Sequence, residues 1–368
     1  MAPPEIADSF VFMDDEETSY HSRRYSQSHA VSSATETLTT PYHRGRSFST
    51  SSIDPSTLAV QIISSVNNKL KGENEIPDDV EICEVTRALL LGAQRLLLIE
   101  ELPKDRRENQ YVLSGYRFYK SANDCLKSLF KLHNETMNIW SHLLGFIFFS
   151  FLSVSVFQRK FPEASAHDLL IFTAFCFASL LCLLCSSIYH TFICHAAHHV
   201  KSFTATLDYI GITFLITASI CIIVHFGFYC DPTSRNRYMI FSCLIGSIGV
   251  ILPFFRFFDT KRYRPLRIGL FVAMAFSSIV PLLHMITAKG WAESFEFLKP
   301  ALLGSLMYLC GVTIYAKRFP EKFFPGKFDL MGMTSHAIWH IFVCLGIFFY
   351  YLGSFHFYSL RESYGCMV

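Results

Sequence analysis

The feature that most constrains the fold of this chain is a series of seven apolar runs, each close to the length that crosses a lipid bilayer. A helix needs about 20 apolar residues to span about 30 Å of hydrocarbon. The runs are Asn138–Phe157, Asp168–Cys194, Ala205–Phe228, Tyr238–Phe257, Leu266–Ala288, Phe297–Ala316 and Met333–Leu352. The chain is therefore predicted to be an all-α membrane protein whose core is a seven-transmembrane-helix bundle.

Composition and charge agree with this fold class. Hydrophobic residues make up 51% of the chain and charged residues only 17%, below the roughly 25% charged residues of soluble domains. No stretch is typical of nucleic-acid binding, so no nucleic-acid partner is expected. The polar N-terminus does not indicate a cleavable signal peptide. Most of the 12 cysteines lie in apolar runs and are interpreted as small hydrophobes, including the Cys182 and Cys185 pair, which is not predicted to bind metal.

Four regions follow from the pattern along the chain. Residues 1–75 are rich in Ser, Thr and charge and are predicted to be a disordered cytosolic tail. Residues 76–132 are predicted to hold an amphipathic helix over Asp79–Glu101, ended by Pro103, and a segment at the membrane surface. The helix is expected to lie on the membrane or on a partner helix. Residues 133–355 form the transmembrane domain and residues 356–368 a short outer tail.

The orientation of the bundle follows from the placement of Lys and Arg, which are enriched in cytosolic loops. Basic residues concentrate before the first run and after the second, fourth and sixth, as in Lys261-Arg262 and Lys317-Arg318. The N-terminus is therefore predicted to be cytosolic and the C-terminus outside.

With this orientation, four spans bring unusual polar residues to the cytosolic leaflet. Ionisable side chains inside a membrane are costly, so their grouping needs an explanation. His336 and His340, four residues apart, lie on one face of a helix. The other members of the group are Glu135, Asn138 and His142 in the first run, Ser186 and His190 in the second, and Asp208 in the third.

Three histidines, His190, His336 and His340, with one position left for water match the ligand set of a catalytic zinc site. Zinc lowers the pKa of bound water to about 7. Asp208 could take a proton from that water or orient it. Ser186 lies one helical turn from His190, so its hydroxyl could bind the water or a carbonyl.

Glu135, Asn138 and His142 have helical spacing and are predicted to orient the ligands or brace neighbouring helices.

Other histidines have simpler interpretations. A single histidine in a membrane span is more often a hydrogen-bond partner between helices than a ligand, and we interpret His225 and His284 in this way. His195, His198 and His199 resemble a metal motif but lie in a short loop, where contacts with lipid headgroups are expected. They are left out of the predicted site.

Four spaced blocks resemble the progestin and adipoQ receptor family, which is related to haemolysin-III-type proteins. The resemblance extends over about Leu102 to Tyr350. The blocks are Tyr111–Arg117, His133–Gly145, Ser186–His190 with Leu207-Asp208-Tyr209, and Ser335–His340. Met137 stands where the family often has Gly.

The resemblance implies zinc at His190, His336 and His340, with Asp208 and Ser186 close by. It also implies a cavity open to the cytosolic leaflet and hydrolysis of ceramide to sphingosine and fatty acid. Fungal members of the family are linked to lipid and zinc homeostasis, and the adiponectin-receptor branch binds an extracellular protein ligand.

The leading hypothesis is a zinc-dependent intramembrane hydrolase of ceramide-type lipid amides with receptor-like character, in the plasma membrane or the endoplasmic reticulum. The alternative is a seven-span receptor in which zinc is structural and no significant hydrolysis occurs. A bis-histidine haem protein fits poorly, because two histidines on one helix face beside an aspartate are not a haem ligand pattern.

Overall fold

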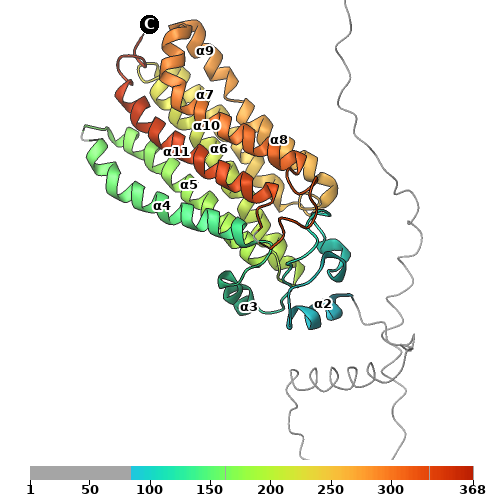
Figure 1. Cartoon of the computed structure of the whole chain (residues 1–368). Helices are drawn as coiled ribbons and strands as arrows, with labels where there is room; N and C mark the ends of the chain where they lie inside the picture. The colour runs from blue at the N-terminus through green and yellow to red at the C-terminus, as the bar shows by residue number, and fades with distance from the viewer. Residues whose placement is uncertain (1–83, 162, 331, 368) are drawn as a thin grey trace, which may run out of the picture. The chain divides into compact units, whose positions relative to one another are not determined.

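The computed structural model describes residues 84–161, 163–330 and 332–367. The disordered tail predicted over residues 1–75 lies outside these ranges. The described residues belong to one compact unit. In its described part, long helices run side by side as a bundle, with two short helices at the end opposite the C-terminus (Figure 1).

Seven helical segments in the described part of the chain are long and apolar enough to cross a membrane, which confirms the predicted fold class. The protein is therefore an integral multi-pass membrane protein. Six of the spans are built on α4 (Thr136–Lys160), α5 (Ala166–Phe192), α6 (His198–Gly227), α7 (Pro232–Ile251), α10 (Trp291–Lys317) and α11 (Ser335–Ser359).

The fifth span, Lys261–Lys289, is interrupted, whereas the sequence predicted one helix over Leu266–Ala288. It consists of α8 (Arg264–Phe276) and α9 (Ile279–Lys289), separated by Ser277 and Ser278. Pro281 lies in the first turn of α9 and has no N–H for the preceding turn, so the helix restarts there. Both serine hydroxyls donate to carbonyl oxygens three residues earlier, which satisfies part of the interrupted backbone.

The amphipathic helix predicted over Asp79–Glu101 is wrong in its extent. Within the described residues the helix, α2, covers only Glu84–Gly92. A Cβ at position 92 would lie 2.6 Å from the carbonyl oxygen of Phe118, so glycine allows a close approach there. The chain then turns and Leu97 exchanges backbone hydrogen bonds of 2.8 and 3.1 Å with Tyr116. Leu97, which lies beyond the end of this helix, packs into a small cluster with Ala88, Leu102 and Phe118.

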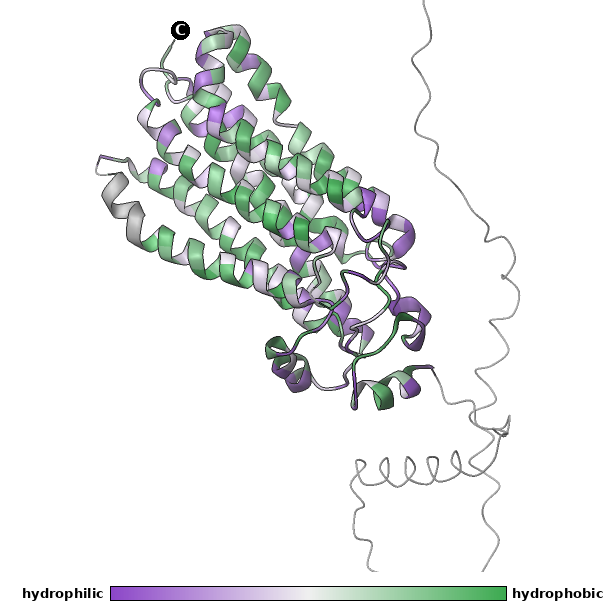
Figure 2. Ribbon diagram, viewed as in Figure 1, coloured by the Kyte–Doolittle hydropathy of each residue, from purple (hydrophilic) through white to green (hydrophobic). Residues whose placement is uncertain are grey.

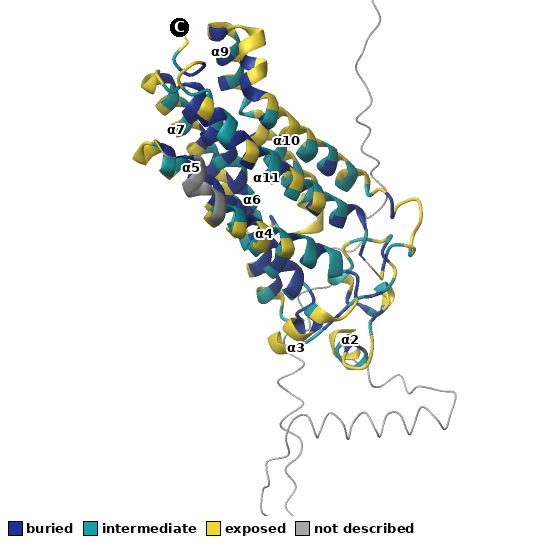
Figure 3. Cartoon of the chain, turned by 60° about the vertical axis from the view of Figure 1, so that its left-hand side comes forward, coloured by how far each residue is buried: buried dark blue, intermediate teal, exposed yellow. Residues whose placement is uncertain are grey.

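The seven spans differ in how deeply they lie in the bundle. Helix α6 is central, with 61% of its apolar window buried, whereas the fifth span is peripheral, with 11% buried. Figure 3 shows the buried residues on the inner faces of the helices. Small residues allow close helix contacts: a Cβ at Gly211 of α6 would lie 2.8 Å from the Cα of Cys182 on α5. Hydrophobic residues cover the middle of the bundle and hydrophilic residues gather towards its ends (Figure 2).

The chain near the C-terminus is fastened to the end of the bundle that is predicted to lie outside. Cys230 and Cys366, which lie outside the apolar runs, form a disulfide. Lys289 donates to the carbonyl oxygens of Gly227, Tyr364 and Gly365 at 2.7, 2.8 and 3.0 Å. Structural disulfides persist in oxidising compartments, which agrees with an outer C-terminus, although the orientation itself stays a prediction.

Candidate metal centre

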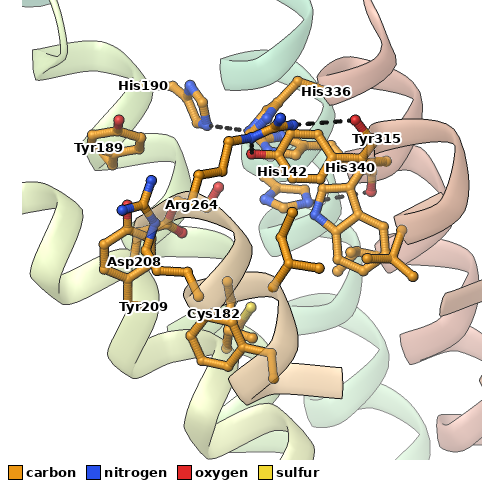
Figure 4. Close-up of a pocket in the computed structure, with 18 of the residues that line it drawn as sticks. His142, Cys182, Tyr189, His190, Asp208, Tyr209, Arg264, Tyr315, His336 and His340 are labelled. Carbon is orange, nitrogen blue, oxygen red and sulfur yellow. Dashed lines mark hydrogen bonds between the residues drawn. The ribbon is translucent and has the colours of Figure 1, made fainter. Parts of the chain in front are cut away.

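Three histidines from two helices converge at the end of the bundle predicted to face the cytosol. His190 lies in the last turn of α5, and His336 and His340 lie at the start of α11. One ligand atom from each lies within 4.8 Å of the other two. The Nε2 atoms of His190 and His336 are 3.2 Å apart, and the close-up in Figure 4 shows the three rings together. The sequence predicted this convergence from the spacing and orientation of the spans.

The donor set fits a zinc ion. With Zn–N bonds of about 2.0–2.1 Å and tetrahedral angles, neighbouring ligand nitrogens lie about 3.3–3.4 Å apart. The separation between His190 and His336 is close to this value. His190 and His340 are each only 2% exposed, and buried imidazoles held near one another are a ligand set that Zn²⁺ prefers. The residues present therefore fit the ion that the sequence predicted.

Side chains at the start of α4 hold two of these imidazoles by their other ring nitrogen. Glu135, which directly precedes α4, places Oε2 at 2.8 Å from Nδ1 of His190. Asn138 donates from Nδ2 to the same carboxylate oxygen at 2.6 Å. The backbone carbonyl oxygen of Asn138 lies 2.9 Å from Nδ1 of His340. A hydrogen bond at Nδ1 fixes the tautomer and leaves Nε2 free to bind a metal.

His142, one turn further along α4, has a different role from the three clustered histidines. Its ring stacks on His340 with centroids 3.8 Å apart and an interplanar angle of 10°. Its Nε2 lies 3.3 Å from the carbonyl oxygen of His340. This stacking limits the rotation of the His340 ring. The placement matches the bracing role that the sequence predicted for His142, which remains a prediction.

Ser186 and Asp208 lie next to the histidine cluster without belonging to it. Both side chains are buried, and both line the same cavity. Asp208 projects from α6 into the cavity that the three histidines line (Figure 4). This arrangement can hold a proton or a water beside the cluster, as the predicted roles of the two residues require.

The cavity has a volume of about 1070 Å³ and runs from the polar end of the bundle between the helices. Its apolar lining includes Phe271 and three leucines that are 40–53% exposed, Leu302, Leu306 and Leu309. Its mouth is lined by charged side chains, among them Arg106, Glu108, Lys201 and Asp259. A cavity with an apolar interior and a few polar groups suits an amphipathic ligand with an acyl chain.

Arg264 and Tyr315 are site residues that sequence reasoning missed. The Arg264 guanidinium lies 3.3 Å from both the hydroxyl and the carbonyl oxygen of Tyr315 and stacks over its ring at 4.6 Å. The Tyr315 ring meets the His336 ring edge-on, with centroids 5.0 Å apart. In the sequence, Arg264 is one of several basic residues after the fourth apolar run, which indicates a cytosolic loop and not a site. Tyr315 carried no signal, because a tyrosine near the end of a span is common.

Glu321 is a third missed residue, in the irregular segment between α10 and α11. Its carboxylate accepts hydrogen bonds from the backbone N and the hydroxyl of Ser335 at 2.7 and 2.5 Å. It also accepts a 3.1 Å hydrogen bond from the amide of Asn109. Unpaired N–H groups at a helix start need such partners. Glu321 therefore caps α11 one residue before His336.

The histidines interpreted as partners between helices do lie in such pairs. His225 on α6 places Nε2 at 2.7 Å from Oδ1 of Asp168 on α5. His284 on α9 lies 3.1 Å from the hydroxyl of Tyr238 on α7. Neither belongs to the group of histidines among the described residues that could hold a metal ion.

Comparison with known proteins places most of the transmembrane domain in one family. Residues 130–351 match the family model described as haemolysin-III related. The adiponectin receptor protein of Drosophila melanogaster is 33% identical over 73% of this chain and 61% of its own length. Progestin and adipoQ receptor-like protein 1 of Caenorhabditis elegans is 35% identical over 70% of this chain and 60% of its own length. An uncharacterized protein of Schizosaccharomyces pombe is 36% identical over 83% of this chain and 68% of its own length. The alignments thus span about three fifths of the fly and worm relatives.

Proposed function

This chain belongs to the haemolysin-III-related family that includes progestin and adipoQ receptors, and from that premise we propose that it is a zinc-dependent intramembrane hydrolase of ceramide-type lipid amides. The observation that carries the proposal is the cluster of His190, His336 and His340 beside a large, mainly apolar cavity. The family does not by itself imply hydrolysis, so the proposal rests on the chemistry of these residues.

His190, His336 and His340 would hold the zinc ion through nitrogens that face one another. When bound, zinc supplies an activated water and polarises an amide carbonyl. Glu135 and the carbonyl oxygen of Asn138 fix the orientation of two of the imidazoles. These contacts hold the ligands in place before the ion binds, which lowers the cost of ordering the site.

Asp208 and Ser186 would take part in proton transfer during amide hydrolysis. Both residues line the same cavity as His190. A carboxylate in this position can take a proton from water and deliver it to the leaving amine. The acyl chain would lie along the apolar wall of the cavity, and the products would be sphingosine and a fatty acid.

A second candidate function is a receptor in which the zinc site is structural, and the names of the fly and worm relatives favour it. Such a receptor would respond to an extracellular protein ligand. A structural zinc site is usually closed by four protein ligands, whereas the group in the described part of the chain has three. We therefore place the hydrolase first, with a role in lipid and zinc homeostasis at the plasma membrane or the endoplasmic reticulum.

The test measures bound zinc and ceramide turnover in the purified full chain. His336→Ala and His340→Ala are expected to lose both, whereas Asp208→Asn should retain zinc and lose turnover. His356→Ala is a matched control, because His356 lies at the far end of the same helix and is only partly buried. Unchanged zinc and turnover in both ligand variants would end the proposal. A parent protein that binds zinc, hydrolyses nothing and still responds to a ligand would favour the receptor.

A further inference from the structure

A second reactive cluster lies beside the metal centre, where two cysteines from distant parts of the chain meet. Cys125 lies in the short helix α3 (Ala122–Lys127), and Cys194 lies just after the end of α5. Their Sγ atoms are 3.6 Å apart, although 69 positions separate them in the sequence. Both cysteines are free thiols and both are buried.

The backbone on both sides of this pair is held by hydrogen bonds. The Ser128 hydroxyl donates to the carbonyl oxygen of Cys125 at 2.6 Å. The backbone N of Tyr119 donates to the carbonyl oxygen of Cys194 at 3.0 Å, and the backbone N of Ala196 donates to the carbonyl oxygen of Tyr119 at 2.7 Å. The two thiols are therefore kept facing each other by the fold.

Arg117 joins the cysteine pair to the metal centre. Its guanidinium donates to the Ser128 hydroxyl at 2.6 Å and to the carbonyl oxygen of His190 at 2.9 Å. The hydrogen bond with Cys125 and the positive charge of Arg117 lower the pKa of the Cys194 thiol, whereas the hydrogen bond with Cys194 and burial raise the pKa of the Cys125 thiol. Thiolates beside a guanidinium are the forms that react with oxidants.

The pair can also be reached by a small molecule. Cys194 lines the large cavity, and the mouth of that cavity is polar. A hydroperoxide that enters the cavity would therefore reach Cys194, and Cys125, which does not line the cavity, is the second thiol at 3.6 Å. A reactive cysteine with a second thiol close by is the arrangement found in redox-sensing sites.

We propose that Cys125 and Cys194 form an oxidisable dithiol that hydroperoxides convert to an intramolecular disulfide. The Cys194 thiolate attacks a peroxide oxygen and the O–O bond breaks, which gives the Cys194 sulfenic acid and, from hydrogen peroxide after proton uptake, water. The Cys125 sulfur then attacks the Cys194 sulfur and releases a second water. In total, two thiols are oxidised, one peroxide is reduced to two waters, and one S–S bond forms.

Only a small movement is needed for this step. The sulfurs must approach from 3.6 Å to the bonded distance of about 2.05 Å, which rotation of the two side chains can supply. On the predicted orientation the pair faces the cytosol, where thiols are normally kept reduced. The bond would form on oxidation and be reversed by cellular thiols, unlike the disulfide of Cys230 and Cys366 at the opposite end.

The bond would connect α3 to the chain four residues after His190. Because it closes a long loop, it restricts the unfolded chain and should raise the thermal unfolding temperature. This effect is separate from any hydrolase activity, so the site can be tested without assuming the proposed function.

The experiment treats the purified, zinc-loaded full chain with hydrogen peroxide, alkylates the remaining thiols in denaturant and digests without reduction. We expect a linked Cys125–Cys194 peptide, the loss of two alkylatable thiols, and a rise in Tm that dithiothreitol reverses. The Cys230–Cys366 peptide serves as an internal standard for a preserved disulfide.

Variants separate the two thiols and identify the first one to react. In Cys125→Ser, Cys194 should stop at the sulfenic acid, which dimedone traps, and peroxide should no longer raise Tm. Cys243→Ser, a matched control at an exposed cysteine, should behave as the parent. The proposal is overturned if Cys125 and Cys194 of the parent both remain alkylatable after peroxide, or if either links to a different cysteine. The measurement on the parent protein decides the question even if a variant does not fold.

Discussion

The carboxylate of Glu135 lies 2.8 Å from Nδ1 of His190, so the start of α4 holds an imidazole at the end of α5. Asn138, one turn into α4, donates to the same carboxylate oxygen and offers its carbonyl oxygen to His340. The first span therefore contacts two of the three clustered histidines, which come from two other helices. Such contacts set the basicity and orientation of metal ligands.

Replacing Glu135 by glutamine should weaken zinc binding without unfolding the protein. The amide keeps the shape and one acceptor oxygen but removes the negative charge that strengthens the His190 ligand. Loss of such a partner typically lowers metal affinity by 10–100-fold. A chelator competition titration on the purified chain measures the change. Glu296→Gln, at an exposed glutamate paired with Lys299, should bind zinc as the parent does. Equal zinc affinity in the Glu135 variant would contradict the role assigned to this contact.

Much of the site could be predicted because membrane helices obey two simple rules. The spacing of His336 and His340 puts both on one helix face, and the placement of Lys and Arg predicts which ends of the spans meet. Together these rules brought His190, Asp208 and the start of α4 to one end of the bundle, where the structure also has them. The depth of each residue within its span was enough to predict this grouping, because the spans run side by side.

The residues that could not be predicted lie where the backbone is irregular or where packing decides the outcome. Glu321 caps α11 from a segment that has no periodic pattern, so no sequence rule connects it with Ser335. The end of α2 at Gly92 depends on the approach of Phe118, which is a tertiary contact. The path of the fifth span brings Arg264 against Tyr315. The sequence around Arg264 indicated only a basic loop.

Replacing Glu321 by alanine should destabilise the start of α11 and weaken zinc binding together. The carboxylate accepts hydrogen bonds from Ser335 N, the Ser335 hydroxyl and Asn109. Its removal leaves buried donors without partners, at a cost of about 1–3 kcal/mol. Thermal unfolding and zinc titration measure both effects. Glu321→Gln, which keeps one acceptor oxygen, should recover part of each loss. An alanine variant with parental Tm and zinc affinity would contradict the capping role.

Removal of zinc should lower the unfolding temperature of the parent protein. A ligand that binds only the folded state at 100 times its Kd stabilises that state by about 2.7 kcal/mol. Dialysis against a chelator, followed by thermal unfolding, is expected to lower Tm, and added zinc should restore it. In His340→Ala, which lacks one of the three clustered imidazoles, the chelator should change Tm little. If the chelator lowers Tm by the same amount in the variant and the parent, the stabilising ion does not bind at the three clustered histidines.

His133 should make stability fall as the solution becomes acidic. The residue precedes the first span and is fully buried. Its Nδ1 accepts a 3.1 Å hydrogen bond from the backbone N of Glu135, a bond that protonation would remove. Burial, reinforced by the positive charge of Arg117, lowers the pKa of His133 from 6.5 to about 3.

The sign of the effect follows from which state binds the proton. Between about pH 6.5 and 3 the unfolded chain is protonated at His133 and the folded chain is not, so the free energy of unfolding falls with falling pH, by at most about 1.4 kcal/mol per pH unit. Above about pH 6.5 this contribution is constant. Thermal unfolding of the parent and of His133→Gln at pH 7.5 and pH 5 measures it, because titration of the other histidines is shared and cancels in the difference. The stability advantage of the parent should shrink at pH 5, and an equal difference at both pH values would show that His133 is not held neutral by the fold.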